Sequence, residues 1–197
     1  MMRPFRTNKR LNKITSTLKA RQHSLGVILE NIHDPHNVSA IFRSCDAVGV
    51  PEVGLLYTVE EFPKISKISS SSAVKWVAQD KFSDTKTCFD SYRQRGFKIY
   101  SSLLNKNAVS LYDLDLTEKV VFVLGNENRG VSEEATELAD EVFYIPMRGM
   151  IQSLNVSVAT AVTLYEAQRQ RMMKGMYEKS DLPDHEIERL IDEWCDK

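Results

Sequence analysis

The apolar run Val120–Leu124 constrains the fold of this chain more than any other segment. It is short enough to be a strand that is buried on both faces, since every position in it is apolar. The run stops at a polar loop beginning with Gly125, and Ser132 then offers an N-cap for a helix. A buried strand, a polar loop and a helix in this order are typical of an α/β fold.

The same order recurs along the chain. We predict strands over residues 25–29, 53–57 and 97–101, and a helix over residues 85–95 that is closed by Gly96. Another helix is capped by Asn37 or Ser39 and ends near Gly49. This alternation predicts a mostly parallel sheet with helices on both faces.

Residues 145–159 have the layout of a ligand-binding bend. An apolar strand passes through a proline and a glycine, and Ser153 or Asn155 can then cap a helix. The first turn of such a helix presents free N–H groups to a ligand, although the same residues can act as caps alone. The helix face predicted to pack on the core carries apolar residues at i, i+3, i+4 and i+7: Val158, Ala161, Val162 and Tyr165.

Several common sites are disfavoured. The spacing of Gly125 and Gly130 is similar to a phosphate-binding loop, but the required lysine is missing, and no Gly-x-Gly-x-x-Gly pattern occurs. His33 and His36 lack a third ligand nearby, so we expect no metal site. Arg43 lies in the middle of its predicted helix, where pairing with Asp46 on the surface is the simplest interpretation from spacing alone.

Three ordered motifs resemble those of the SpoU class of RNA 2′-O-ribose methyltransferases, within the SPOUT superfamily. They are an Asn-x-x-Ala-Ile-x-Arg-Ser pattern over residues 37–44, a Leu-Gly-Asn-Glu pattern over 124–127, and the segment 145–159. The resemblance covers residues 25–172, and the flanking segments are similar to those of bacterial members that methylate guanosine 18 in the D-loop of tRNA. Methylation of the tRNA wobble nucleotide or of rRNA is the alternative within the class. A noncatalytic RNA-binding protein and a nucleotide-handling enzyme are alternatives outside it.

The resemblance implies an α/β fold with a C-terminal deep trefoil knot, S-adenosylmethionine as the methyl donor, and a homodimer with active sites at the subunit interface. It assigns the catalytic site to Arg43, Asn37, Glu127, Ser153 and Asn155. It assigns the cofactor pocket to Ser102, Leu124, Gly125, Ile145, Met147 and Leu154.

The two ends of the chain carry opposite charge, which the net charge of −1 conceals. Residues 178–197 hold eight acidic side chains, and their apolar stripe is expected to pack on the protein or on a second copy: Ile187, Leu190, Ile191 and Trp194. Residues 1–29 hold cations without a single acid, as expected of a segment that binds RNA phosphates: Arg3, Arg6, Lys9, Arg10, Lys13, Lys19 and Arg21.

We therefore divide the chain into a basic RNA-binding extension (residues 1–24), the methyltransferase core (25–172) and an acidic helical extension (173–197). No apolar run is long enough to span a membrane, and the three cysteines lack metal or redox spacing, so we expect a cytoplasmic protein with free thiols. Trp76 is expected in the core rather than stacked on a base. The serines at residues 69–72 depart from the glycine that the family often has there, which predicts an altered loop near the substrate.

Overall fold

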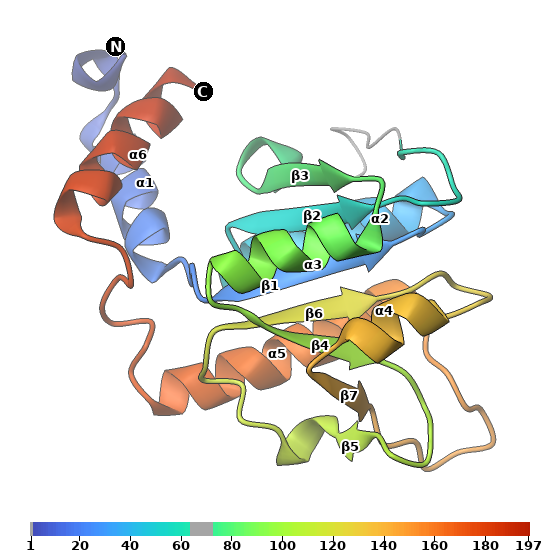
Figure 1. Cartoon of the computed structure of the whole chain (residues 1–197). Coiled ribbons are helices and arrows are strands. Elements are labelled where there is room, and N and C mark those ends of the chain that lie inside the picture. Colours follow the sequence, from blue (N-terminus) through green and yellow to red (C-terminus); the bar gives the residue numbers. More distant parts are fainter. Residues whose placement is uncertain (1, 64–72) are drawn as a thin grey trace.

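The computed structural model describes residues 2–63 and 73–197, and the predicted loop at residues 69–72 lies outside them. Seven parallel strands form one sheet in the order β3-β2-β1-β6-β4-β7-β5 (Figure 1). The α/β fold with a parallel sheet is therefore confirmed. The strands are β1 (Leu25–Glu30), β2 (Glu52–Leu56), β3 (Ala78–Phe82), β4 (Lys98–Ser102), β5 (Val109–Ser110), β6 (Val120–Leu124) and β7 (Glu141–Tyr144).

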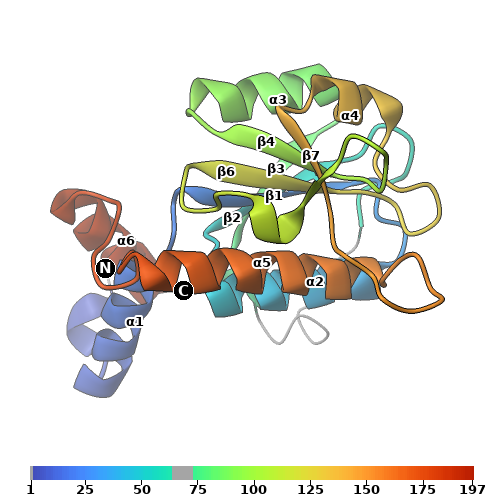
Figure 2. The ribbon, with the colours of Figure 1, turned by 90° about the horizontal axis from the view of Figure 1, so that it is seen from below.

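Helices cover both faces of the sheet, as the alternating pattern predicts. Helices α2 (Pro35–Val48) and α5 (Val156–Met173) lie side by side on one face, and α3 (Thr85–Gln94) and α4 (Glu133–Leu138) lie on the other (Figure 2). Strand β6 in the centre is buried along its whole length, because its alternate side chains enter the two apolar clusters above and below the sheet.

Helix α2 starts earlier than expected. Its N-cap is Asp34, whose carboxylate accepts a hydrogen bond from the backbone N–H of His36 at 2.8 Å, so the predicted caps at Asn37 and Ser39 are wrong. Pro35 suits the first helical position, where no N–H donor is needed. The helix ends at Gly49, as predicted, with a φ of 87° that favours glycine.

The predicted core-facing side of α5 is wrong for Val158 and Tyr165, although Val162 packs against the core as expected. Val158 and Tyr165 are 47% and 52% exposed, whereas Thr160, Thr163 and Leu164 are buried. The two threonine hydroxyls donate to the carbonyls of Val156 and Ala159 one turn earlier, at 2.7 and 2.9 Å. This pairing satisfies the hydroxyls, so a face with threonines can be buried while an apolar stripe stays on the surface.

The two ends of the chain form a small unit beside the sheet (Figure 1). Helix α1 (Asn8–Ala20) packs against α6 (Asp184–Asp196), and the short 3-10 turn η1 (Arg3–Phe5) also contacts α6. The predicted stripe of α6 is confirmed as a packing surface, since Ile187, Ile191 and Trp194 are buried against α1. Two further 3-10 turns are η2 (Ala73–Lys75) and η3 (Leu111–Asp113).

Across the described residues, no helix has both the length and the apolar character needed to cross a membrane. The three cysteines, Cys45, Cys88 and Cys195, are free thiols, as expected, and all three are buried.

Candidate active site at the carboxyl edge of the sheet

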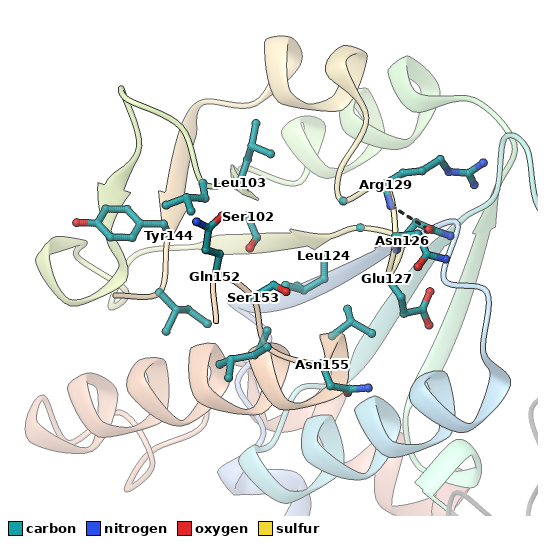
Figure 3. Close-up of a pocket in the computed structure, with 18 of the residues that line it drawn as sticks. Ser102, Leu103, Leu124, Asn126, Glu127, Arg129, Tyr144, Gln152, Ser153 and Asn155 are labelled. Atoms are coloured by element: carbon teal, nitrogen blue, oxygen red, sulfur yellow. Dashed lines mark hydrogen bonds between the residues drawn. The ribbon is translucent and has the colours of Figure 1, made fainter. Parts of the chain in front are cut away.

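A cavity of about 370 Å³ opens where β4, β6 and β7 end (Figure 3). Carboxyl ends of parallel strands are the usual ligand sites of open α/β sheets. Figure 3 shows Ser102 and Gln152 at one end of the cavity and Glu127 and Asn155 at the other. All the residues assigned above to a cofactor pocket line it: Ser102, Leu124, Gly125, Ile145, Met147 and Leu154. Glu127, Ser153 and Asn155 line it as well.

Gly125 allows the loop after β6, which forms one wall of the cavity, to fold back against the end of that strand. A Cβ atom at this position would lie 2.2 Å from the carbonyl carbon of Gly130 and from the amide nitrogen of Val131. Such distances exclude any side chain, so only glycine permits the loop to return to the strand end. The returning loop is fixed by the side-chain Oδ1 of Asn126, which accepts from the N–H groups of Asn128 and Arg129 at 3.0 and 3.2 Å.

Glu127 is held by donors from the first motif. Its carboxylate accepts from the backbone N–H groups of His33 and Asp34 at 3.0 and 3.2 Å, and from Nδ2 of Asn37 at 2.8 Å. Partial burial alone would raise the pKa of Glu127, but these hydrogen bonds outweigh it and hold the pKa below the ordinary value. The carboxylate is therefore negative at neutral pH, at the edge of the cavity.

Asn37 connects this carboxylate to the start of α5. Its Oδ1 accepts from Nδ2 of Asn155 at 3.1 Å. The Oδ1 of Asn155 in turn accepts from the N–H of Ser157 at 2.9 Å, which makes Asn155 the N-cap of α5. Side chains from three distant segments thus form one chain of hydrogen bonds, and each amide is oriented by a partner on either side.

Arg43 lies outside this cavity. It is exposed in the middle of α2 and is not among the lining residues. Its expected surface partner, Asp46, instead pairs with Arg21 at 2.6 Å, so that interpretation of Arg43 is wrong. Arg43 is six residues beyond Asn37, which corresponds to about 9 Å along the helix.

Two asparagines that were not assigned to the site, Asn31 and Asn126 of the second motif, hold the edge of the sheet together. Asn31 has a φ of 50°, and its Oδ1 accepts from the N–H groups of Thr58 and Val59, both at 3.0 Å. Asn126 Nδ2 donates to the carbonyl of Asn31 at 2.7 Å, which links the loops after β1, β2 and β6. An asparagine just beyond a predicted strand, as Asn31 is beyond residues 25–29, is a signal for such a left-handed turn.

The basic residues near the N-terminus separate into two groups. Arg21 is 1% exposed and donates to the carbonyl of Val50, so it is not available to a phosphate. Arg3 pairs with Glu188 and Asp192 of α6, and Arg6 donates to the carbonyl of Cys195. The remaining members keep exposed or half-exposed side chains on α1: Lys9, Arg10, Lys13 and Lys19.

Within the described residues, no group of three His, Cys, Asp or Glu side chains could hold a metal ion.

Comparison with known proteins identifies relatives of this chain. The SpoU rRNA Methylase family matches residues 24–165. A tRNA (guanosine(18)-2′-O)-methyltransferase of Aquifex aeolicus is 42% identical over 187 residues, which are 95% of this chain and 89% of the relative.

Two solved structures extend the comparison. The A. aeolicus TrmH/SpoU tRNA modifying enzyme superimposes with a TM-score of 0.89 at 42% identity, covering 95% of both chains. The SpoU methyltransferase AviRb from Streptomyces viridochromogenes, solved in complex with AdoMet, gives a TM-score of 0.68 at 26% identity, covering 79% of this chain and 61% of AviRb.

Proposed function

Because the chain belongs to the SpoU rRNA methylase family, we propose that it transfers a methyl group from S-adenosylmethionine to a ribose 2′-hydroxyl of tRNA, at guanosine 18 of the D-loop. The observation that carries the proposal is the hydrogen-bonded chain Glu127–Asn37–Asn155 at the cavity. This hydrogen-bonded chain joins side chains of all three motifs at the cavity. In addition, the tRNA (guanosine(18)-2′-O)-methyltransferase of A. aeolicus matches 95% of this chain, so the match reaches into both terminal extensions.

The cavity suits the methyl donor. Its volume of about 370 Å³ lies within the usual range for small-molecule sites, about 300–1,000 Å³. Leu124, Ile145 and Leu154 offer an apolar wall, and Gly125 allows the loop up to Val131 to close against the end of β6. S-adenosylmethionine supplies a methyl group that its positively charged sulfur has already activated. The protein therefore has to align the reactants and accept one proton.

The ribose 2′-oxygen forms a bond to the methyl carbon while the carbon–sulfur bond breaks, and the hydroxyl loses its proton. Asn37, Glu127, Ser153 and Asn155 are proposed to orient the ribose at the polar end of the cavity. Arg43 is proposed either to take the hydroxyl proton with help from the substrate phosphate, or to stay charged and stabilise the developing alkoxide. A guanidinium is almost always protonated, which makes the second role the simpler one physically.

We further propose that two copies of the chain complete the site. The stripe of α5 that stays on the surface is apolar, and Val158 and Tyr165 are about half exposed. Helix α5 packs beside α2, which carries the exposed Arg43. A second copy seated on this surface would cover the stripe and bring its own residues to the cavity. In this arrangement Arg43 of one copy acts at the cavity of the other copy, although it lies outside the cavity of its own chain.

A trefoil knot is proposed for the C-terminal part of the core. Strand β7 lies between β4 and β5, although β4 and β5 follow each other directly along the chain. The chain reaches β7 from α4 on one face of the sheet and continues into α5 on the opposite face (Figure 2). It thus passes beside the segment that joins β4 to β6, as threading would require.

Residues 1–24 and 173–197 are proposed as tRNA-binding and packing extensions of a cytoplasmic enzyme.

The proposal is tested by incubating the purified protein with labelled S-adenosylmethionine and tRNA transcripts, and then mapping the methylated nucleotide. Label on the ribose of guanosine 18 is expected, and a transcript with 2′-deoxyguanosine at that position should stay unlabelled. Label at the wobble position or only in rRNA would contradict guanosine 18 as the substrate but would still support methyl transfer to a ribose. Donor binding without transfer to any RNA would favour a noncatalytic RNA-binding protein.

A further inference from the structure

A second cavity lies between the terminal helices and the core, and the methyl-transfer site does not use it. It measures about 360 Å³ and is lined by residues of α1, α2 and α6 together with Trp76, which follows η2. Trp76 and Trp194 contact each other in its wall, with ring centroids 4.7 Å apart at 45°. We refer to this space, lined by Arg10, Lys13, Asp46, Trp76 and Trp194, as the tryptophan cleft.

The cleft combines a half-buried aromatic ring with cations, and Nζ of Lys75 also lies 4.9 Å from the centre of the Trp76 ring. Trp194 is only 6% exposed, whereas Trp76 is half-buried and packs at the edge of the apolar cluster of α1 and α6, so its expected place in the core is confirmed only in part. The guanidinium carbon of Arg10 lies 5.1 Å from the centre of the Trp76 ring, and Lys13 at the rim is exposed. The single acid in the lining, Asp46, is paired with Arg21 at 2.6 Å, so its charge is compensated within the protein.

Aromatic rings beside exposed cations are the usual means of binding unpaired nucleotides, because bases stack on rings and phosphates pair with cations. We infer that the tryptophan cleft binds an unpaired nucleotide of the tRNA substrate, and this inference rests on the proposed function. The base stacks on Trp76 in the place now taken by the Arg10 guanidinium. Arg10 and Lys13 then pair with the phosphates on either side.

The position of the cleft on α2 supports this assignment. Asn37 belongs to the methyl-transfer site, and Asp46 belongs to the cleft, nine residues later on the same helix. This separation corresponds to about 13 Å along the helix axis. Arg43 lies between them, three residues before Asp46 and therefore on the same side of the helix. Nine residues also rotate the helix by about half a revolution, so Asn37 and Asp46 lie on opposite sides of α2, and a strand that joins the two sites would cross the exposed side of the helix past Arg43.

Intrinsic fluorescence tests the inference directly, because Trp76 and Trp194 are the only two tryptophans of the chain. A tRNA transcript titrated into the full-length protein is expected to quench tryptophan emission as a base stacks on Trp76. Trp76→Phe should lose most of this response and keep binding the transcript, whereas Trp194→Phe should retain the response. S-adenosylmethionine alone should leave the emission unchanged, since the cleft is a separate cavity.

The salt dependence of tRNA binding provides a second readout. Lys13→Ala is expected to reduce the slope of log affinity against log salt by about 1, as for the loss of one phosphate contact. Lys86→Ala is the matched control: this lysine is exposed on α3, on the opposite face of the sheet, and its loss should leave the slope unchanged.

The outcomes separate this inference from the proposed function. Normal methylation with no quenching, or with quenching that persists in Trp76→Phe, overturns the nucleotide site and spares the enzyme. An unchanged salt slope in Lys13→Ala overturns it as well. Quenching that depends on Trp76, together with the expected Lys13 effect but no methyl transfer, supports the site and contradicts the proposed function.

Discussion

At the scale of single residues, the side chains of the cavity that belong to motifs could be predicted from the sequence. Side chains that bond to the backbone inside the fold could not. Asn37, Glu127 and Asn155 come together in one hydrogen-bonded chain, and a motif resemblance placed all of them in one site. Arg21 belongs to a basic segment in the sequence, but the fold buries it. Composition cannot distinguish a phosphate-binding arginine from a buried one, because the difference lies in tertiary partners such as the Val50 carbonyl.

Removal of the Asn37 amide should change the titration of Glu127. Because hydrogen bonds lower its pKa in the folded chain, their stabilising effect is complete above the ordinary glutamate pKa of about 4.3 and is lost as the pH falls through the lowered value. In Asn37→Ala, the pKa of Glu127 should rise toward the ordinary value, so the pH-dependent stabilisation becomes smaller and its loss is complete at a higher pH. Carboxyl-carbon NMR titration, with Glu127→Gln for assignment, measures this shift.

The control for that titration is Asn12→Ala, at an exposed asparagine on α1 far from the cavity. It should leave the pKa of Glu127 unchanged. If Asn37→Ala also leaves it unchanged, the amide does not hold the carboxylate in solution, and the proposed coupling of the first and second motifs is wrong.

Arg21 should contribute to folding rather than to RNA binding. Arg21→Ala removes the partner of Asp46 and leaves the Val50 carbonyl without its donor, so we expect a loss of about 3 kcal/mol in the free energy of unfolding. Chemical denaturation measures it. Arg189→Ala, at an exposed arginine on α6, should change stability by less than about 0.5 kcal/mol. Equal effects of the two changes would show that burial of Arg21 is not what stabilises the fold.

At the scale of elements, helix and strand positions follow from apolar periodicity, whereas the buried side of α5 does not. Its core face carries Thr160 and Thr163, which satisfy their hydroxyls within the helix and so behave as small apolar residues. Periodicity favours the more apolar side, with Val158 and Tyr165, which stays on the surface of a single chain. A helix with two apolar sides can cover the sheet and still offer an interface.

The pair of terminal helices should unfold separately from the sheet. Their apolar cluster, which includes Ile14, Leu18 and Ile191, is distinct from the two clusters that flank the sheet. Ile191 is 1% exposed, so Ile191→Ala should cost about 2–5 kcal/mol of the stability of this pair. Amide hydrogen exchange should therefore accelerate in α1 and α6 and remain slow in β1 and β6.

The matched control for that measurement is Ile28→Ala, because Ile28 is equally buried but belongs to a cluster beside the sheet. It should accelerate exchange in the sheet as well. Uniform acceleration across the chain in Ile191→Ala would mean that the terminal helices and the sheet unfold together.

At the scale of the whole molecule, the class of fold was predictable, but the order of the strands was not. Parallel strands with helices between them follow from the alternation of apolar runs and amphipathic segments. No periodicity indicates that β7 enters between β4 and β5, because strand order depends on pairing between distant segments. The cavity depends on that insertion, since its walls come from the ends of β4, β6 and β7.

If the active site is shared between two copies of the chain, two inactive variants should restore activity when they form a mixed dimer. A site formed within one chain would not allow this. If Arg43 of one copy acts at the cavity of the other, Arg43→Ala and Asn155→Ala should each be nearly inactive alone. Co-refolding equal amounts should restore about one quarter of the wild-type activity, because half of the dimers are mixed and each mixed dimer has one intact site. Methyl transfer to tRNA transcripts measures the recovery.

Two controls make the recovery interpretable. Asn37→Ala with Asn155→Ala should not recover, because Asn37 and Asn155 bond to each other within one chain and every mixed site then lacks one of them. Val158→Asp places a charge on the exposed stripe of α5 and should abolish recovery together with the dimer, as measured by sedimentation. Absence of recovery in dimers that two different affinity tags show to be mixed would place Arg43 at the cavity of its own chain, which requires α2 to move toward the bound ribose.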